Sequence, residues 1–139
     1  MKVIIAGSRS IDGEVGERAV RAALWLVEAL GWKITEIVCG EARGIDSCGR
    51  KVAQECGIKV ASFPADWDGE GKRAGLIRNE IMAAYADALI AITNGSPGTR
   101  HMIQVALGQG LKVLVIEIPS LVTTPRVAEV QKLWTEESF

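Results

Sequence analysis

Five short apolar runs alternate with longer stretches whose apolar residues recur at helical spacing, and this alternation constrains the fold more than any other feature of the chain. The apolar runs have the length of buried strands and cover residues 2–6, 34–39, 59–63, 88–92 and 112–118. The stretches between them predict helices over residues 12–30, 45–56, 75–86 and 99–107. Strands and helices in strict alternation predict a parallel sheet with helices on both faces.

The predicted fold is therefore a Rossmann-like three-layer α/β sandwich around a five-stranded parallel sheet. Right-handed crossovers restrict the topology, and we expect the strand order 3-2-1-4-5 with its switch point between the first and fourth strands. Residues 1–118 form the predicted domain. Residues 119–139 form a C-terminal tail in which 125–134 predict a short helix. We expect its apolar side chains to pack on their own domain or on a second copy in a homodimer: Val127, Val130, Leu133 and Trp134.

The composition limits which classes of partner the chain is expected to bind. Its 139 residues, 48% of them hydrophobic, suffice for one sizeable core. The net charge of −1 argues against nucleic acid as the main partner, because a dedicated binder usually carries a strong positive excess. No secretory leader or membrane span is evident, so we expect a cytoplasmic protein without a membrane partner.

The cysteines and the single histidine do not predict a metal site. Cys39, Cys48 and Cys56 are scattered without metal-ligand spacing, and His101 has no second histidine to join it. An odd number of cysteines without a secretory signal predicts reduced thiols. We expect Cys48 and Cys56 to lie on the core face of their helix, and we predict neither a metal nor a required cofactor.

The loops that follow the strands differ strongly from the loops that precede them. Residues 7–10, 40–46, 64–68 and 94–100 each follow a predicted strand and are rich in glycine or polar side chains. The loops at the opposite edge are short and plain. Because ligands of open α/β sheets bind beyond the carboxyl ends of the strands, this asymmetry predicts a ligand site at that edge.

Two of these loops, residues 40–44 and 95–98, lead directly into helices. Unpaired N–H groups and the helix dipole favour an anion at such a junction, and glycine lets the backbone approach it closely. Neither loop has the Walker A or the Gly-x-Gly-x-x-Gly pattern. The alternative interpretation is that the glycines only form tight turns, but two such loops flanking the first strand favour an anion site.

The side chains around these loops suit a phosphate-bearing ligand. Arginine makes forked contacts with phosphate, serine and threonine donate hydroxyl hydrogen bonds, and Asp66 can accept from ribose hydroxyls. Trp67 either stacks on a ring of the ligand or packs as part of the core. The predicted ligand-binding residues are Gly7, Ser8, Arg9, Gly40, Ala42, Arg43, Gly44, Asp46, Asp66, Trp67, Arg78, Asn79, Met82, Asn94, Gly95, Ser96, Gly98 and Thr99.

The third predicted helix has one polar side, with Gly75, Arg78, Asn79 and Met82 at i, i+3, i+4 and i+7. Asparagine is a poor helix former, so this side either faces a ligand or is a solvated surface. The apolar residues of the same helix are expected to face the core: Leu76, Ile77, Ile81 and Ala84.

Five motifs in fixed order resemble a known family: Ile-Ile-Ala-Gly-Ser-Arg at 4–9, Gly-x-Ala-Arg-Gly-x-Asp at 40–46, Pro-Ala-Asp-Trp at 64–67, Ala-Gly-x-x-Arg-Asn-x-x-Met at 74–82 and Gly-Thr-x-His-Met at 98–102. Together they resemble the YspA-like, cpYpsA-related branch of the SLOG superfamily over residues 2–116. That superfamily includes LOG-type nucleotide phosphoribohydrolases, the DNA-processing protein DprA and domains that sense NAD-derived signals. The resemblance implies a Rossmann-like fold and a nucleotide or nucleotide-derived ligand.

One departure from the LOG enzymes bears on catalysis. Their Gly-Gly-x-Gly-Thr-x-x-Glu motif resembles residues 95–102, but their catalytic glutamate is Met102 here. A thioether can neither transfer a proton nor stabilise an oxocarbenium-like charge. The candidate catalytic groups that remain are Asp46, Asp66 and His101.

Three functions follow as hypotheses. The first is binding or sensing of a nucleotide or an NAD- or ADP-ribose-like molecule. The second is hydrolysis of an N-glycosidic or phosphoribosyl bond of a nucleotide. The third, by analogy with DprA, is single-stranded nucleic-acid binding, against which the charge balance and the lack of interleaved aromatic residues both count.

Overall fold

The computed structural model describes residues 1–119, and the predicted helix at 125–134 lies outside them. Strands and helices alternate as the apolar pattern predicts. The elements, in chain order, are β1 (Lys2–Gly7), α1 (Gly13–Ala29), β2 (Glu36–Cys39), α2 (Ile45–Glu55), β3 (Lys59–Ser62), α3 (Trp67–Glu70), the 3-10 helix η1 (Gly71–Arg73), α4 (Ala74–Tyr85), β4 (Ala88–Thr93), α5 (Pro97–Gly108) and β5 (Lys112–Glu117).

The five strands form one parallel sheet in the order β3-β2-β1-β4-β5, which confirms the predicted topology. Strand β1 lies at the centre, where Ile4 pairs with Val38 of β2 and Ile5 pairs with Ile90 of β4. Every residue of β2 and β4 is buried, as expected for strands covered on both faces. The switch point therefore lies between β1 and β4, where a ligand site is expected.

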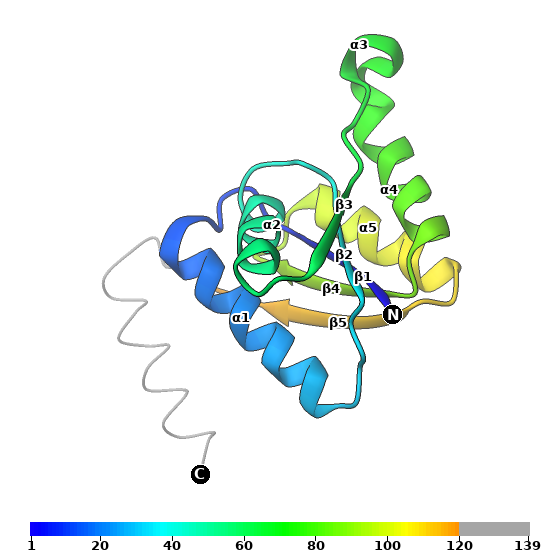
Figure 1. Ribbon diagram of the computed structural model, residues 1–139. Coiled ribbons are helices and arrows are strands. Elements are labelled where there is room, and N and C mark those ends of the chain that lie inside the picture. Colours follow the sequence, from blue (N-terminus) through cyan, green and yellow to red (C-terminus); the bar gives the residue numbers. More distant parts are fainter. Residues whose placement is uncertain (120–139) are drawn as a thin grey trace.

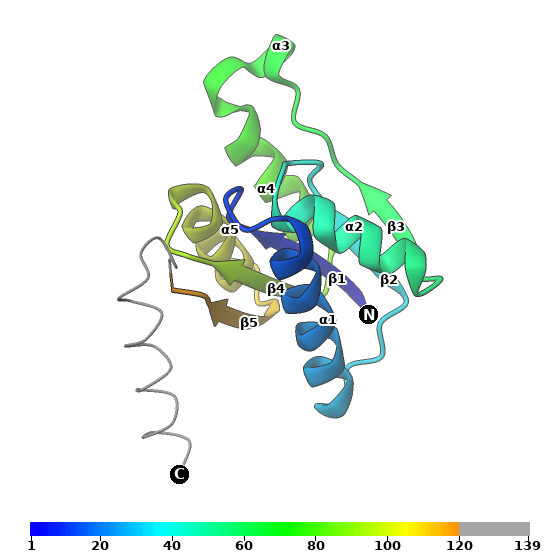
Figure 2. The same ribbon diagram turned by 90° about the vertical axis from the view of Figure 1, so that its left-hand side faces the viewer.

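Successive strand residues point to opposite faces, so the sheet builds two separate cores. On one face Ile5 and Ile90 pack with Val20 of α1 and Val52 of α2. On the other face Ile4 and Leu89 pack with residues of α4 and α5. Figures 1 and 2 show the resulting three layers, with α1 and α2 on one side of the sheet and α4 and α5 on the other.

The segment between β3 and α4 extends away from the sheet as a projecting arm (Figures 1 and 2). The arm contains α3 and η1, which the sequence pattern did not predict, and it continues into the first turn of α4. Asp66 is the N-cap residue of α3, and its Oδ1 accepts a hydrogen bond from the Gly69 N–H at 2.9 Å. This capping bond accounts for a short helix in a glycine-rich stretch.

Apolar residues at the ends of α1 and α2 do not join the core. Leu30, at the end of the first predicted helix, is 62% exposed, and Cys56, wrongly expected on the core face of the second, is exposed. Both residues are the C-cap positions of their helices. The chain turns there through a glycine with positive φ, Gly31 and Gly57 respectively, so each side chain lies beyond the part of the helix that the sheet covers.

The polar side of helix α4, for which a ligand-facing and a solvated position both stayed open, is turned inward: Asn79 and Met82 are buried. The predicted core placement of Leu76 and Ile81 is wrong, since they are 44% and 50% exposed. Ala84 is also exposed. The reason is that α4 borders a polar cavity at the carboxyl edge of the sheet, described below, so its polar side faces inward. No helix within residues 1–119 is long and apolar enough to cross a bilayer.

Candidate functional site

A cavity of about 480 Å³ opens at the carboxyl edge of the sheet, beside the switch point. Its size falls within the range typical of small-molecule sites, roughly 300–1,000 Å³. It is bordered by the β1–α1, β2–α2 and β4–α5 loops, by α4 and by the projecting arm. The lining residues are Ala6, Gly7, Arg9, Ser10, Ala42, Asp46, Trp67, Lys72, Gly75, Leu76, Arg78, Asn79, Met82, Ser96, Pro97, Gly98, Thr99 and Met102.

A larger cavity of about 680 Å³ lies at the opposite, amino edge. We call it the amino-edge cavity, and the first one the carboxyl-edge cavity. The amino-edge cavity is lined mainly by apolar side chains, among them Leu24, Trp25 and Ile58. The carboxyl-edge cavity is the better functional candidate, because polar groups from four separate segments converge there.

Two guanidinium groups face the carboxyl-edge cavity without a carboxylate partner. Arg9 comes from the β1–α1 loop and Arg78 from α4, and neither lies within 4.0 Å of a carboxylate oxygen in the described part of the chain. Burial lowers the pKa of Arg78; the positive charge of Arg9 adds to this effect, while Asp46 opposes it. Two like charges beside one cavity create a region that an anion would stabilise.

Arg78 is held in place by polar contacts on both sides. Its Nη1 donates a hydrogen bond to the carbonyl oxygen of Gly40, at the end of β2. Its Nε donates to Oδ1 of the neighbouring Asn79 at 3.2 Å. A Cβ at Gly40 would come within 2.5 Å of Nη1, so any side chain there would displace the guanidinium. Because Gly40 has no side chain, the guanidinium has room to lie beside it.

Asp46 is a buried carboxylate at the start of α2. Its Oδ2 accepts hydrogen bonds from the N–H groups of Gly40, at 3.2 Å, and Ala42, at 3.4 Å. Burial raises the pKa of Asp46, while Arg78 and the backbone hydrogen bonds act against this rise. The β2–α2 loop was predicted to offer its N–H groups to an anion, but Asp46 already occupies two of them.

The first turn of α5, in contrast, has two N–H groups that no acceptor among the described residues occupies. Ser96 is the N-cap residue of α5, but its side chain makes no capping hydrogen bond, and Pro97 occupies the first helical position. The N–H groups of Gly98 and Thr99 have no acceptor among residues 1–119. Both residues line the cavity, and the space beside Gly98 is open. The start of α5 is therefore the part of the site best suited to bind an anion.

Four hydroxyl groups form a chain behind this helix start. Oγ1 of Thr93 lies 3.3 Å from Oγ of Ser8, which lies 3.0 Å from Oγ of Ser96, and Ser96 lies 2.9 Å from Oγ1 of Thr99. The N–H groups of Asn94 and Gly95 donate to Ser8 and Thr93. Four hydroxyl protons serve three links, so one proton remains to be donated elsewhere.

Glycine is also required where the loops pack against one another. Gly44 has φ +75°, and a Cβ there would overlap the carbonyl oxygen of Ser8. A Cβ on Gly7 would overlap the carbonyl oxygen of Ile92. The ends of β1, β2 and β4 can converge on one cavity because these two positions have no side chain.

His101 lies behind the part of the wall formed by Asn79, whereas the neighbouring Met102 is itself part of the wall. Nδ2 of Asn79 lies 3.1 Å from Nδ1 of His101 and 3.5 Å from the carbonyl oxygen of Gly98. His101 does not line the cavity, whereas Met102 does and is 1% exposed. In the described chain, the position that carries a glutamate in LOG enzymes is thus an apolar part of the cavity wall.

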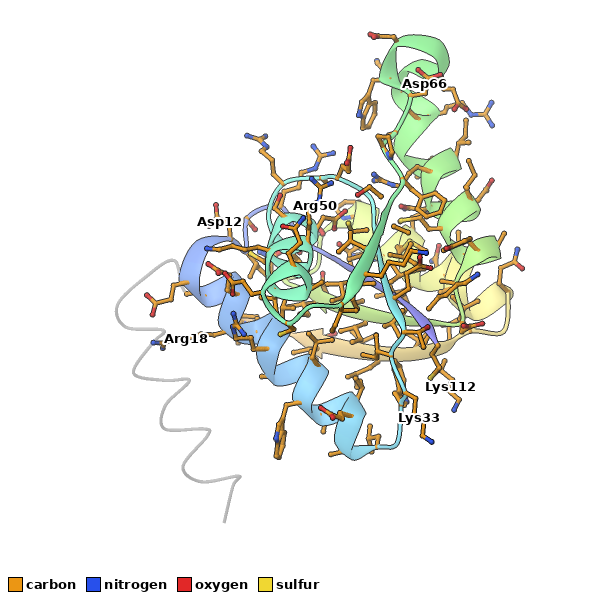
Figure 3. The ribbon with its side chains drawn as sticks, in the orientation of Figure 1. Asp12, Arg18, Lys33, Arg50, Asp66 and Lys112 are labelled. Carbon is orange, nitrogen blue, oxygen red and sulfur yellow. The ribbon has the colours of Figure 1, made fainter. Side chains whose placement is uncertain are left out.

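The rim on the side of the arm is formed by Trp67, Lys72 and Leu76. Trp67 is 51% exposed, and a Cβ on Gly75 would lie 3.4 Å from its ring. Figure 3 shows Asp66 near the tip of the arm, where it caps α3. Asp66 lines a separate, smaller cavity and not this one.

The structure brings most of the predicted ligand-binding residues to or directly behind this cavity. Seven predicted residues do not line its surface: Ser8, Gly40, Arg43, Gly44, Asp66, Asn94 and Gly95, and neither does the candidate catalytic His101. Arg43 is exposed, and Nδ2 of Asn94 donates to Oγ of Ser10 instead. Seven lining residues are absent from the predicted set: Ala6, Ser10, Lys72, Gly75, Leu76, Pro97 and Met102. For Ser10, Lys72 and Pro97, a place in a loop or in the arm was the only signal in the sequence.

The described residues offer no obvious metal centre. No group of three or more His, Cys, Asp or Glu side chains within residues 1–119 could hold a metal ion. Of the carboxylates in this range, Asp46 is the one that lines the cavity, and its Oδ2 already accepts two backbone hydrogen bonds. The chemistry of the site is therefore that of donors and positive charge.

Fold and site together define a Rossmann-like α/β domain with a polar, arginine-bearing cavity at its switch point. The sequence is 38% identical over 85 residues to the Gene 61 protein of Mycobacterium phage D29, an alignment that covers 56% of this chain and 68% of the phage protein. The chain belongs to the same family as that phage protein. No model of a known protein family matches the sequence.

The fold is shared with a solved structure. DNA processing protein A (DprA) from Streptococcus pneumoniae superposes with a TM-score of 0.68 at 20% sequence identity. The superposition covers 94% of this chain and 56% of the DprA chain. The chain thus spans little more than half of DprA, and the likeness establishes the Rossmann-like fold.

Proposed function

We propose that the carboxyl-edge cavity binds a phosphate-bearing small molecule of the nucleotide or nucleotide-derived kind, as a binding or sensing site. The observation that carries the proposal is the pair Arg9 and Arg78, two positive groups that face one cavity and have no carboxylate partner among residues 1–119. The N–H groups of Gly98 and Thr99, which no acceptor in this range occupies, supply further donors. Charge-assisted hydrogen bonds of this kind are the strong ones.

The rest of the ligand is suggested by the rim. The half-exposed Trp67 offers an aromatic face at the cavity entrance, and stacking on an aromatic ring is a common way to hold a base. A phosphate at the start of α5 and a base at the arm together describe a nucleotide or an ADP-ribose-like molecule. The resemblance to the YspA-like branch of the SLOG superfamily points to the same class of ligand.

The test is isothermal titration calorimetry of the full chain with AMP, NAD, ADP-ribose, inorganic phosphate and adenosine. We expect binding of the phosphate-bearing compounds and much weaker binding of adenosine, which lacks the anion. A single-stranded oligonucleotide belongs in the same panel, because the solved protein with this fold is named for DNA processing. No binding of any nucleotide at millimolar concentration would contradict the proposal.

A second candidate function is hydrolysis of an N-glycosidic or phosphoribosyl bond, and Asp46 is the observation that favours it. It is buried at the cavity wall with its pKa raised by burial, and a carboxyl that can hold a proton is what assisted departure of a base requires. Release of free base from nucleoside monophosphates, and its loss in Asp46→Asn, is the test. Inactivity with intact binding would leave the binding function alone.

A further inference from the structure

Helix α1 carries a second apolar stripe that the described residues leave uncovered. Its members recur at i, i+4, i+7, i+11 and i+15, a spacing that places them on one side of the helix. Three of the larger ones are well exposed, with Val15 at 58%, Leu26 at 38% and Leu30 at 62%. The complete stripe is Val15, Ala19, Ala22, Leu26 and Leu30.

This stripe faces away from α2. Glu17 of α1 pairs with Lys51 of α2 at 3.0 Å, and Arg21 pairs with Glu55, so the side of α1 that carries Glu17 and Arg21 is turned toward α2. At 100° per residue, the stripe lies on the opposite side of the helix. In Figure 2, α2 lies on one side of α1 and β5 on the other. The stripe is therefore turned toward the β5 edge of the sheet.

Strand β5 presents an apolar row to the same space. Leu114 and Ile116 of β5 alternate with Ile118, which follows the end of the strand, and all three are partly buried against the core on the α1 side. On its other face, Val113 packs against the core beneath α4 and α5, and Val115 is 40% exposed. Together, Val15, Ala19, Ala22, Leu26, Leu30, Leu114, Ile116 and Ile118 form what we call the α1–β5 face. Apolar surface of this extent usually has a partner.

We propose that residues 125–134 of the same chain dock on the α1–β5 face as its cover. Their apolar residues Val127, Val130, Leu133 and Trp134 recur at helical spacing, as a helix with one buried side requires. Ten residues of helix extend about 15 Å, whereas the stripe from Val15 to Leu30 extends about 22 Å along α1. The occupant thus matches the face in chemistry and is long enough to cover most of it, from Val15 to near Leu26.

Connectivity favours this segment over a second copy. Residue 119 follows directly after Ile118, which is itself part of the face, so only a short linker separates residues 125–134 from their docking site. A tethered segment has an effective concentration in the millimolar range, far above that of a separate molecule. Because β5 ends and α1 begins at the carboxyl edge, the segment can run back along α1 toward Leu26.

The experiment is amide hydrogen exchange of the full chain, as the wild type and as three variants. Leu26→Asp places a charge on the α1–β5 face. Trp25→Asp is the matched control, because Trp25 is the adjacent, 72% exposed residue of α1 and lines the amino-edge cavity instead. Val130→Asp is the reciprocal change in the segment itself. Circular dichroism and the protection of β1 and β4 amides check that each variant is folded.

We expect amides of residues 125–134 to exchange about tenfold or more faster in Leu26→Asp than in the wild type, and to be unchanged in Trp25→Asp. Val130→Asp should in turn increase exchange at residues 114–118. Unprotected amides at 125–134 in the wild type would overturn the proposal. Loss of protection in Trp25→Asp alone would move the segment to the amino-edge cavity, and protection that rises with protein concentration would identify a second copy as the occupant.

Discussion

The guanidinium of Arg78 donates a hydrogen bond to the carbonyl oxygen of Gly40, so helix α4 holds the end of strand β2 across the carboxyl-edge cavity. This bond orients a positive charge that has no carboxylate of the described residues within salt-bridge distance. The same contact thus holds the β2–α2 loop in place and positions the guanidinium that we expect to bind the ligand. Arg78 is for this reason the residue whose replacement should reveal most about the site.

Replacing Arg78 by alanine should weaken binding of phosphate-bearing ligands by about 1.5–3 kcal/mol, the usual loss for a hydrogen bond to a charged group. Calorimetry of Arg78→Ala with AMP or ADP-ribose measures this loss. Arg43→Ala is the matched control, because Arg43 is exposed and does not line the cavity. Equal losses in the two variants would mean that overall charge, and not this site, governs binding.

Gly40→Ala should move Arg78 without unfolding the domain. The new Cβ would come within 2.5 Å of the Arg78 guanidinium, which is the far end of a flexible side chain and can shift. We expect weaker ligand binding together with a small loss of stability, measured by calorimetry and urea denaturation. Unchanged affinity would show that the position of Arg78 is not set by Gly40.

Gly98→Ala should change stability and affinity in opposite directions. Gly98 lies in the first turn of α5 with open space beside it, so alanine should raise the free energy of unfolding by up to about 1 kcal/mol. The added methyl group lies where we place the phosphate and should weaken ligand binding. Gly108→Ala, in the same helix and also facing open space, is the control and should leave affinity unchanged.

Trp67→Ala should weaken binding of nucleotides by about 1–3 kcal/mol, the usual contribution of stacking on one base, but leave binding of inorganic phosphate unchanged. The reason is that Trp67 lies on the rim formed by the arm, away from the start of α5. Trp25→Ala removes another exposed tryptophan outside this cavity and serves as the control. Equal weakening of phosphate and nucleotide would contradict a stacking contact.

The stability difference between the wild type and Asp46→Asn should depend on pH. Burial raises the pKa of Asp46 in the folded chain, whereas in the unfolded chain this pKa stays at about 3.9. As the pH rises, the unfolded state loses the proton first and gains stability. Urea denaturation should therefore give the wild type its highest free energy of unfolding, relative to Asp46→Asn, below about pH 4. This difference should decline as the pH rises, until the carboxyl of the folded chain has also ionised. A difference independent of pH would contradict the raised pKa.

The sequence predicted the fold because its signals were local. Apolar runs such as residues 88–92 and the glycines that end helices, such as Gly31, depend on neighbours along the chain, and the strand order followed from general rules of handedness. The predicted edge for the site rested on the same logic. In the described chain, the cavity has that position.

What sequence reasoning could not predict depends on three-dimensional contacts. Periodicity alone cannot distinguish a cavity from solvent, so the sequence left open which of the two the polar side of α4 faces. For the same reason Leu76, Ile81 and Ala84 were wrongly expected to face the core. Nothing in the β2–α2 loop showed that the carboxylate of Asp46 would accept its N–H groups. The tilt of the arm, which places Lys72 at the rim and Asp66 beyond it, is likewise a long-range property.

The contrast between the floor and the rim of the cavity has a consequence for signalling. The inner side rests on strands that are buried on both faces and joined by hydroxyl links, whereas the outer side belongs to a slender projection with one capped turn. A ligand would meet a floor whose polar groups are already bonded to one another and a rim that fewer contacts hold. If binding changes the conformation of the domain, we expect the change in the arm and not in the sheet. A protein that distinguishes the bound from the free state should then contact the arm.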